Sequence, residues 1–131
     1  HINIMTKDAR NILSETISFK DSIQQNANLA AFVSACYTSN IDLIGRCIKD
    51  LIVEPQRAHL IPHFKELQSA AYKTGALGCS ISGAGPSVFA LSKNSFIAES
   101  IQEEFKKVMT DNKIPHTIYT SPINQEGVYK Y

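Results

Sequence analysis

Apolar residues recur every three or four positions along much of the chain, which is the spacing of amphipathic helices. This spacing predicts a helix over residues 21–37 and a second helix over residues 41–52. The second helix is expected to end at Glu54-Pro55, because proline disfavours helical geometry in the residue before it. Both helices carry one apolar face and one polar face, so each is expected to pack on a neighbour.

Two more helices are predicted in the second half of the chain. Pro62 suits the first turn of a helix that buries Phe64, Leu67 and Ala71, and Gly75 is its expected C-cap. The clearest pattern covers residues 95–112, where one apolar stripe faces away from a charged side.

Shorter segments alternate between apolar and polar residues or are continuously apolar, which is typical of strands. A strand over residues 2–5 is followed by Thr6 as a helix N-cap and by a short helix over residues 7–13. Three further strands are predicted over residues 77–82, 87–91 and 116–120. Residues 121–131 are expected to form either an edge strand or a loose tail.

The predicted order is one strand, several helices, two strands, one helix and one strand. This order favours an α+β fold, a two-layer ferredoxin-like sandwich with a four-stranded, mainly antiparallel sheet. The extra helices then lie in the first crossover. A chain of 131 residues with 44% apolar residues is expected to form one domain.

Charge and cysteine content narrow the function classes. Thirteen basic residues against twelve acidic residues give a net charge of +1, which does not favour a nucleic-acid partner. No apolar run reaches the roughly 20 residues that span a bilayer, so no membrane partner is expected. Cys36, Cys47 and Cys79 are odd in number and none lies in a CxxC pair, which fits a reducing cytoplasm better than a disulfide framework or a zinc site.

Glycines concentrate in one place. Four of the six glycines lie within residues 75–87, and the turn Gly83-Ala84-Gly85-Pro86 joins two predicted strands. Glycine allows a backbone to approach a ligand closely, and exposed N–H groups in such a turn can hold an anion. The segment is neither a Walker A loop nor a dinucleotide-binding loop. A plain tight turn and a loop beside a ligand both fit the spacing.

Other candidate side chains have ordinary structural interpretations. His59 and His63 are four residues apart, but Pro62 lies between them, so a shared metal is not expected. Cys79 in an apolar strand is interpreted as a buried, inert thiol and His116 as structural. Arg57 and Arg10 carry planar forks that match carboxylates and phosphates, although each alone is typical of a surface arginine. The carboxylates form no acid–base pair, and we expect no catalytic residue and no metal site in this chain.

The run GCSISGAGPSVFALS resembles the third conserved motif of the GHMP small-molecule kinases. The longer stretches TKDARNIL, LAAFVSACYTSNIDLIGRCIKDLIVEPQR and LIPHFKELQSAAYKTGALGCSISGAGPSVFAL resemble, in order, the C-terminal half of the homoserine kinases within that family. The resemblance covers roughly residues 2–120. Ala84 and Ser87 stand where members of the family often carry Ser and Thr.

The resemblance implies transfer of the ATP γ-phosphate to the hydroxyl of L-homoserine, a step of threonine biosynthesis. It implies that residues 1–131 are the C-terminal domain, and that ATP phosphates and Mg²⁺ are bound mainly by an N-terminal domain absent from this chain. It places Ser82, Gly83, Ala84 and Gly85 near the phosphates and substrate. It assigns homoserine binding to Arg57 and, less directly, to Arg10.

Alternatives stay open at this point. Two-layer α+β folds host many functions, so the chain could be a stand-alone binding or regulatory module. It could also be the C-terminal domain of another GHMP kinase. The expected partners are L-homoserine, ATP and the chain's own N-terminal domain, with a homodimer allowed.

Overall fold

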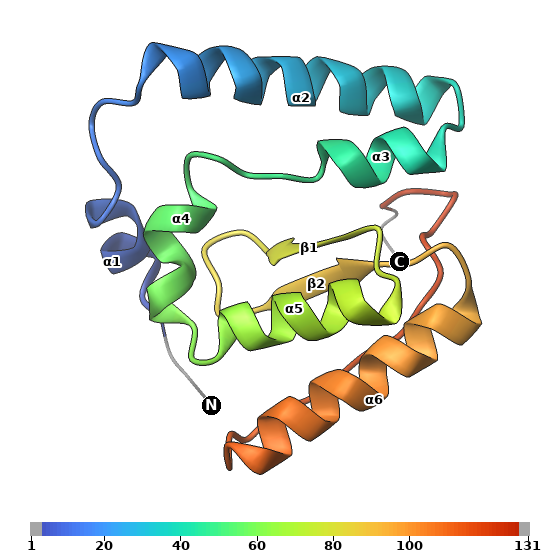
Figure 1. Ribbon diagram of the computed structural model, residues 1–131. Helices are drawn as coiled ribbons and strands as arrows, with labels where there is room; N and C mark the ends of the chain where they lie inside the picture. The colour runs from blue at the N-terminus through green and yellow to red at the C-terminus, as the bar shows by residue number, and fades with distance from the viewer. Residues whose placement is uncertain (1–3, 129–131) are drawn as a thin grey trace.

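The computed structural model describes residues 4–128 and has an α+β fold in which helices outnumber strands (Figure 1). The elements in chain order are α1 (Thr6–Asn11), α2 (Phe19–Tyr37), α3 (Ile41–Cys47), α4 (Glu54–Arg57), the 3₁₀ helix η1 (Ala58–Leu60), α5 (Phe64–Thr74), β1 (Gly78–Ile81), β2 (Val88–Leu91) and α6 (Ser95–Asp111). No helix in this described part of the chain combines the length and the apolar character needed to cross a membrane.

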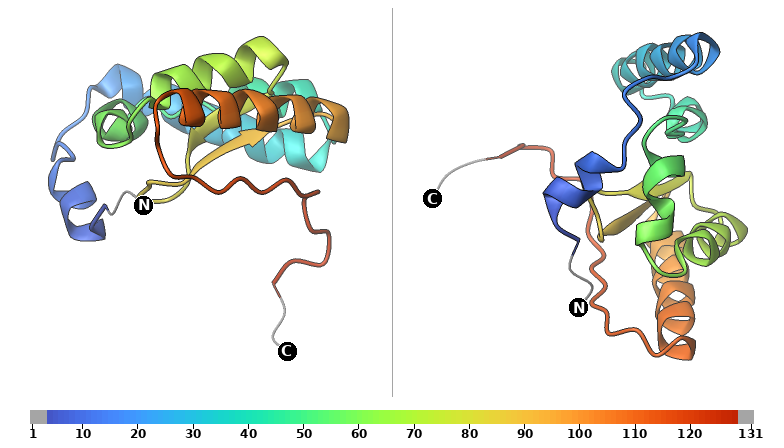
Figure 2. Two further views of the ribbon diagram at one scale, coloured as in Figure 1. Left: turned by 90° about the horizontal axis from the view of Figure 1, so that it is seen from below. Right: turned by 90° about the vertical axis from the view of Figure 1, so that its left-hand side faces the viewer.

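β1 and β2 form an antiparallel hairpin, in which Gly78 pairs with Leu91 and Ile81 pairs with Val88. α5 and α6 cover one face of this hairpin (Figure 2). Between the helices and the strands lies a buried cluster of Ala71, Cys79 and Ile101. Because these three residues come from α5, β1 and α6, the cluster joins the two layers and fixes the hairpin against the helices.

α5 ends at the glycine that the sequence predicts as its C-cap. Gly75 follows the helix with a φ of 101°, a left-handed conformation that glycine adopts without steric cost. Its N–H and that of Ala76 donate to carbonyls of the last helical turn. Phe64, Leu67 and Ala71 are buried, which confirms the predicted inner face of this helix.

α2 and α3 pack against each other at the side of the hairpin (Figure 1). Side-chain caps begin both helices: Ser18 accepts from the N–H of Asp21, and Asn40 accepts from the N–H of Leu43. Asn94 caps α6 in the same way. The helices predicted over 21–37 and 95–112 are therefore confirmed with ends within two residues.

The helix predicted over residues 41–52 is shorter than expected. α3 ends at Cys47, and Ile48 leaves helical geometry with a ψ of 72°. Ile48 instead lies directly over Gly78, where an added Cβ would come within 2.8 Å of its side chain. Ile48 therefore packs on the sheet instead of continuing the helix.

The prediction that Glu54-Pro55 ends a helix is wrong, because these residues begin α4. The side chain of Asp50 stabilises the turn that leads into α4, because its Oδ1 accepts hydrogen bonds from the N–H groups of Ile52 and Val53. Pro55 lies in the first turn, where a helix needs no N–H donor. Proline therefore acts here as a helix start rather than a stop.

Two further boundaries differ from the predictions. The N-cap of α1 is Met5 rather than Thr6, and no side chain caps this helix. Ile4 and Met5 are not in a strand, and the other residues of the strand predicted over 2–5 lie outside the described residues. α5 begins at Phe64, after His63 in a left-handed conformation, so Pro62 precedes the helix instead of opening it.

The structure does not confirm the predicted four-stranded ferredoxin-like sheet, because the sheet formed by residues 4–128 has two strands. Residues 116–120 are extended but belong to no ladder within the described chain, and residues 121–128 form no strand. The alternation that predicted a strand is still present: His116 and Ile118 are partly buried, whereas Thr117 and Tyr119 are exposed. The segment has the burial pattern of a strand without a hydrogen-bonded neighbour.

Candidate functional site

The turn between β1 and β2 has the backbone geometry that its glycines predict. Gly83 and Gly85 have φ values of 61° and 82°, in the left-handed region that favours glycine. The N–H of Ser82 donates to the carbonyl of Ser87 over 2.8 Å, which closes the turn. Ser82 and Gly83 are exposed, whereas Ala84 and Gly85 are partly buried. The turn therefore presents open backbone on its first half and packs against the protein on its second.

Arg57 joins this turn to the N-terminal helix. Its Nε donates to the carbonyl of Ala9 in α1 over 2.8 Å, and its Nη1 donates to the carbonyl of Gly83 over 3.3 Å. Within residues 4–128, the hydrogen bonds of this guanidinium come from Nε and Nη1. The candidate residues Arg57 and Gly83 are thus adjacent, although 26 residues separate them in the chain.

α1, α4 and the turn gather at one edge of the molecule (Figure 1). Arg10 lies in the last turn of α1, beside the Ala9 that Arg57 contacts, and its side chain is exposed. The N–H of Ser14, just after α1, donates to Oε1 of Gln56 in α4 over 2.7 Å. These contacts bring two arginines and an open glycine turn to one edge, a combination suited to anionic ligands.

Glu54 is a part of this region that the sequence analysis did not identify as functional. The residue is 9% exposed, and its carboxylate accepts two hydrogen bonds, from Ser80 Oγ over 2.6 Å and from Gln68 Nε2 over 2.9 Å. Gln68 also donates to the carbonyl of Cys79. The only sequence clue is a carboxylate next to a proline, which gives no indication of partners 14 and 26 residues away.

The cysteine and histidines have mostly structural environments. Burial, with a smaller contribution from the Glu54 carboxylate, raises the pKa of Cys79 to about 12, so its thiol is protonated near neutral pH. Cys79 is 1% exposed, which agrees with the predicted inert thiol. His63 pairs with Glu66 through Nδ1 over 2.9 Å, while His59 lies in η1. His116 Nδ1 lies 2.8 Å from the carbonyl of Ile114.

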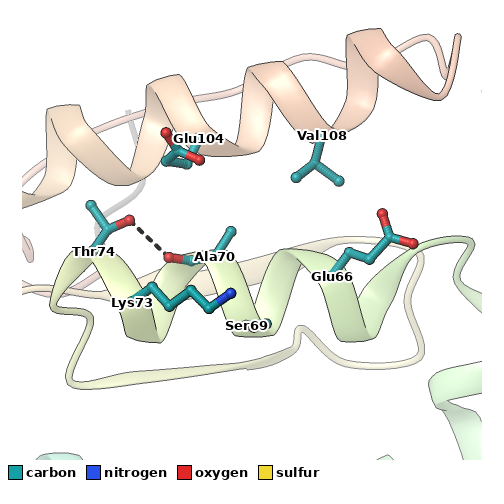
Figure 3. A pocket seen from close by; sticks show the side chains of 7 residues that line it. All are labelled: Glu66, Ser69, Ala70, Lys73, Thr74, Glu104 and Val108. Carbon is teal, nitrogen blue, oxygen red and sulfur yellow. Dashed lines mark hydrogen bonds between the residues drawn. The ribbon is translucent and has the colours of Figure 1, made fainter.

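Two hollows among the described residues are lined by neither Arg57 nor Arg10, although the larger one reaches the glycine turn at Pro86. One, of about 530 Å³, lies between α5 and α6 and is lined by Glu66, Lys73, Glu104 and four smaller side chains (Figure 3). Its lining includes neither arginine and no part of the glycine turn. A larger groove of about 1300 Å³ lies between β2, α6 and the segment that follows α6. The charged edge formed by α1, α4 and the turn is therefore the candidate site.

Comparisons with known proteins identify the family to which the chain belongs. The family model described as "GHMP kinases C terminal" matches residues 23–111. A homoserine kinase of Chlorobium phaeobacteroides (strain BS1) is 40% identical over 97% of this chain and 40% of its own length. A homoserine kinase of Xylella fastidiosa (strain M12) is 36% identical over 93% of this chain and 38% of its own length.

A solved structure shares the fold as well as the sequence. The crystal structure of homoserine kinase from Cytophaga hutchinsonii ATCC 33406 superimposes with a TM-score of 0.92 and 43% identity, over 95% of this chain and 40% of that one. This chain thus spans about 40% of the length of the homoserine kinases it matches. Because the family model covers more than half of its residues, the chain belongs to the GHMP kinases and corresponds to their C-terminal domain.

Proposed function

We propose that the protein containing this chain is a homoserine kinase, which transfers the γ-phosphate of ATP to the hydroxyl of L-homoserine. The observation that carries the proposal is the convergence of Arg57, α1 and the glycine turn at one edge of the domain. The matches to homoserine kinases over nearly the whole chain indicate which substrate to propose. The step belongs to threonine biosynthesis, and the three free cysteines suit the cytoplasm.

In this proposal the arginines recognise the amino acid. The free Nη2 of Arg57 binds the α-carboxylate of homoserine, and the exposed Arg10 supplies a second positive charge. A carboxylate held there fixes the direction of the hydroxyl at the other end of the substrate. Phosphoryl transfer depends mainly on such positioning and on stabilisation of charge.

The glycine turn borders the phosphates in the proposed complex. The exposed Gly83 lies beside the positive charge of Arg57, and the exposed Ser82 adds a hydroxyl next to it, which suits an anionic group. The N-terminal domain, which lies outside this chain, supplies the loop that binds the ATP phosphates and the ligands of Mg²⁺. ATP and Mg²⁺ are thus held mainly by that domain, and this chain contributes the substrate side.

An ADP-release assay on the full-length protein tests the proposal. L-homoserine is expected to support turnover, whereas 3-aminopropan-1-ol, which has the same amine and hydroxyl but no carboxylate, is expected to be a poor substrate. Residues 1–131 alone are expected to be inactive, because the proposed phosphate-binding domain is absent. Turnover of both alcohols at equal kcat/KM would contradict carboxylate recognition, and turnover by the isolated chain would contradict the division between domains.

We also propose that the sheet has four strands in the full-length protein, but with a strand from outside this chain in place of the strand predicted over residues 2–5. The pairing of Ser82 with Ser87 in the hairpin directs the N–H groups of Val88 and Ala90 towards the edge of β2 that β1 does not occupy. The groove of about 1300 Å³ separates this edge from residues 116–120. A strand inserted there can pair with both walls of the groove.

The strand is expected to come from the part of the protein that precedes this chain in its relatives. Ile4 lies beside Gly85, in the turn that leads into β2, with its Cδ1 3.6 Å from the position of an added Cβ on Gly85. A preceding strand that leads to Ile4 would therefore run antiparallel to β2. Amide hydrogen exchange in the full-length protein checks this: Ala90 and Ile118 should be protected about as strongly as Phe89, and rapid exchange at both would contradict the inserted strand. The homodimer that the sequence analysis left open also stays a prediction, and light scattering on the same sample would measure the mass that tests it.

A further inference from the structure

Glu54 is a buried carboxylate at the first position of α4. The residue is 9% exposed, and both of its oxygens are engaged: Oε2 accepts from Ser80 and Oε1 accepts from Gln68. Lys65 lies 3.8 Å from Oε1, with most of its own side chain in solvent. The carboxylate is thus tied to β1 through Ser80 and to α5 through Gln68.

This burial needs an explanation, because removing a carboxylate from water costs free energy that its partners must offset. An apolar side chain of similar size would fill the same space without that cost. Hydrogen bonds differ from apolar packing in that they fix direction as well as distance. The arrangement around Glu54 therefore fixes how the first residue of α4 is oriented on the layer formed by β1 and α5.

The orientation of α4 decides where Arg57 points. α4 is a single helical turn in which Glu54 is the first residue and Arg57 is the last. At the far end of this turn the Arg57 guanidinium spans the carbonyls of Ala9 and Gly83. A rotation or slide of so short a helix moves both ends together, so loss of the Glu54 contacts would displace the guanidinium relative to the glycine turn.

We propose that Glu54 is a positioning residue, which holds Arg57 against the glycine turn through its hydrogen bonds to Ser80 and Gln68. This inference rests on the proposed function, in which Arg57 binds the substrate carboxylate. Glu54 itself does not touch the substrate, since its carboxylate faces β1 and α5. Its effect on substrate binding passes through Arg57.

The test compares Glu54→Gln with wild type in the full-length enzyme. Glutamine keeps the volume of the side chain but removes its charge and replaces one accepting oxygen with a donor. Both hydrogen bonds therefore lose their charge assistance, and the Ser80 hydroxyl must reverse its direction to keep its bond. We expect the KM for homoserine to rise about 10-fold, below the roughly 100-fold that a 1 Å misplacement can cost, while the KM for ATP changes less than about 2-fold. Ser80→Ala, which removes only the hydroxyl, should likewise raise the KM for homoserine and leave the KM for ATP nearly unchanged.

Two controls separate positioning from stability. Glu66→Gln makes the same chemical change at an exposed glutamate of α5 and should leave both KM values unchanged. In an Arg57→Ala background, Glu54→Gln should change kcat/KM for homoserine by less than about 2-fold, because a residue that acts through Arg57 has no further effect once Arg57 is gone. A full 10-fold effect in that background, or an equal rise in both KM values, would overturn the proposal.

A measurement without turnover keeps the inference separate from the proposed activity. The Nε–H of Arg57 is hydrogen-bonded to Ala9 and should exchange slowly with water in an NMR experiment on the full-length protein. Glu54→Gln should accelerate this exchange about 10-fold, whereas Glu66→Gln should not change it. If the wild-type protein does not phosphorylate homoserine, the proposed function fails, and the exchange rates alone decide whether Glu54 positions Arg57. Equal rates in wild type and Glu54→Gln would overturn that role.

Discussion

Ser80 Oγ donates a 2.6 Å hydrogen bond to Oε2 of Glu54, and both residues are more than nine-tenths buried. The bond connects β1 to the start of α4 across 26 residues of sequence. Because β1 also carries the glycine turn at its end, this one contact joins the core of the domain to its candidate site. A defect here is expected to affect stability and substrate binding together.

The first prediction concerns the stability contributed by this bond. Ser80→Ala should lower the free energy of unfolding by about 1–3 kcal/mol, because it leaves a buried carboxylate oxygen without its donor. Urea denaturation of wild type and variant measures the change. Ser69→Ala, at an exposed position of α5, is the matched control and should be nearly neutral. A neutral Ser80→Ala would mean that water or another donor replaces the hydroxyl.

The second prediction concerns Cys79 and alkaline pH. Burial raises the pKa of its thiol from 9.0 to about 12, so above pH 9 the unfolded chain releases this proton while the folded chain retains it. Stability from the protonated thiol is therefore complete below pH 9 and falls as pH rises, by about 1.4 kcal/mol between pH 8 and pH 10. Cys79→Ala should lack this part of the decrease.

Urea denaturation at both pH values measures the difference between the two proteins. The comparison is needed because burial, with smaller contributions that include the charge of Cys79, also raises the pKa of Tyr72, which lowers the stability of both proteins at high pH. The loss from pH 8 to pH 10 should thus be larger in wild type than in Cys79→Ala. Parallel losses in both proteins would show that the thiol titrates normally in the folded state.

The third prediction concerns the glycine turn. Gly85 has a φ of 82°, and an added Cβ would lie 3.2 Å from Ile61 Cδ1. Gly85→Val should therefore abolish most of the activity and lower stability by about 1–3 kcal/mol, because valine is both strained and crowded there. Gly83→Ala is the informative partner: its φ of 61° is unfavourable, but no atom lies within 4 Å of an added Cβ, so only the backbone strain applies.

Steady-state kinetics and urea denaturation on both variants check this prediction. Gly83→Ala should lose less stability than Gly85→Val, and its carbonyl should remain available to Arg57. Wild-type kcat/KM for homoserine in Gly85→Val would show that the turn does not border the substrate or the phosphates.

Local patterns predicted the long helices and the hairpin well. α2 and α6 carry sustained periodicity, and Gly75 ends α5 because few other residues adopt its conformation without strain. Glu54-Pro55 was misinterpreted as a helix end, because proline is compatible with a first turn as well as with a stop. The difference lies in Asp50, whose side chain prepares the new helix, and this contact has no periodic pattern.

The candidate site was less predictable than the fold. Only the resemblance to a family gives Arg57 and the glycine turn a functional interpretation, since the arginine alone is compatible with an ordinary surface residue and the glycines alone with an ordinary turn. The contacts that unite them are between residues 26 to 48 positions apart, and a single sequence contains no information on such pairs. The segment 116–120 shows the complementary case: its alternation correctly predicted alternating burial, but a ladder also needs a partner strand.

The last prediction concerns Arg57, whose guanidinium in the proposed complex binds the substrate carboxylate. Arg57→Ala in the full-length enzyme should reduce kcat/KM for homoserine by about 30-fold to several thousand-fold, the range expected for loss of a shielded charge-assisted contact of about 2–5 kcal/mol. The KM for ATP should change far less, because the proposal places the nucleotide contacts in the N-terminal domain. Arg46→Ala, at an exposed position of α3, removes the same charge elsewhere and should leave the kinetics unchanged.

Arg57→Lys separates the proposed charge contribution of this side chain from its two carbonyl contacts in the structure. Lysine keeps the positive charge, but it cannot bind Ala9, Gly83 and a carboxylate at once, because it lacks the planar fork. It should therefore recover only part of the kcat/KM lost in Arg57→Ala. Full recovery would mean that charge alone suffices and that the two carbonyl contacts are incidental. An unchanged kcat/KM for homoserine in Arg57→Ala would refute the binding role, whereas an equal rise of both KM values would indicate that Arg57 acts only by holding α1, α4 and the glycine turn together.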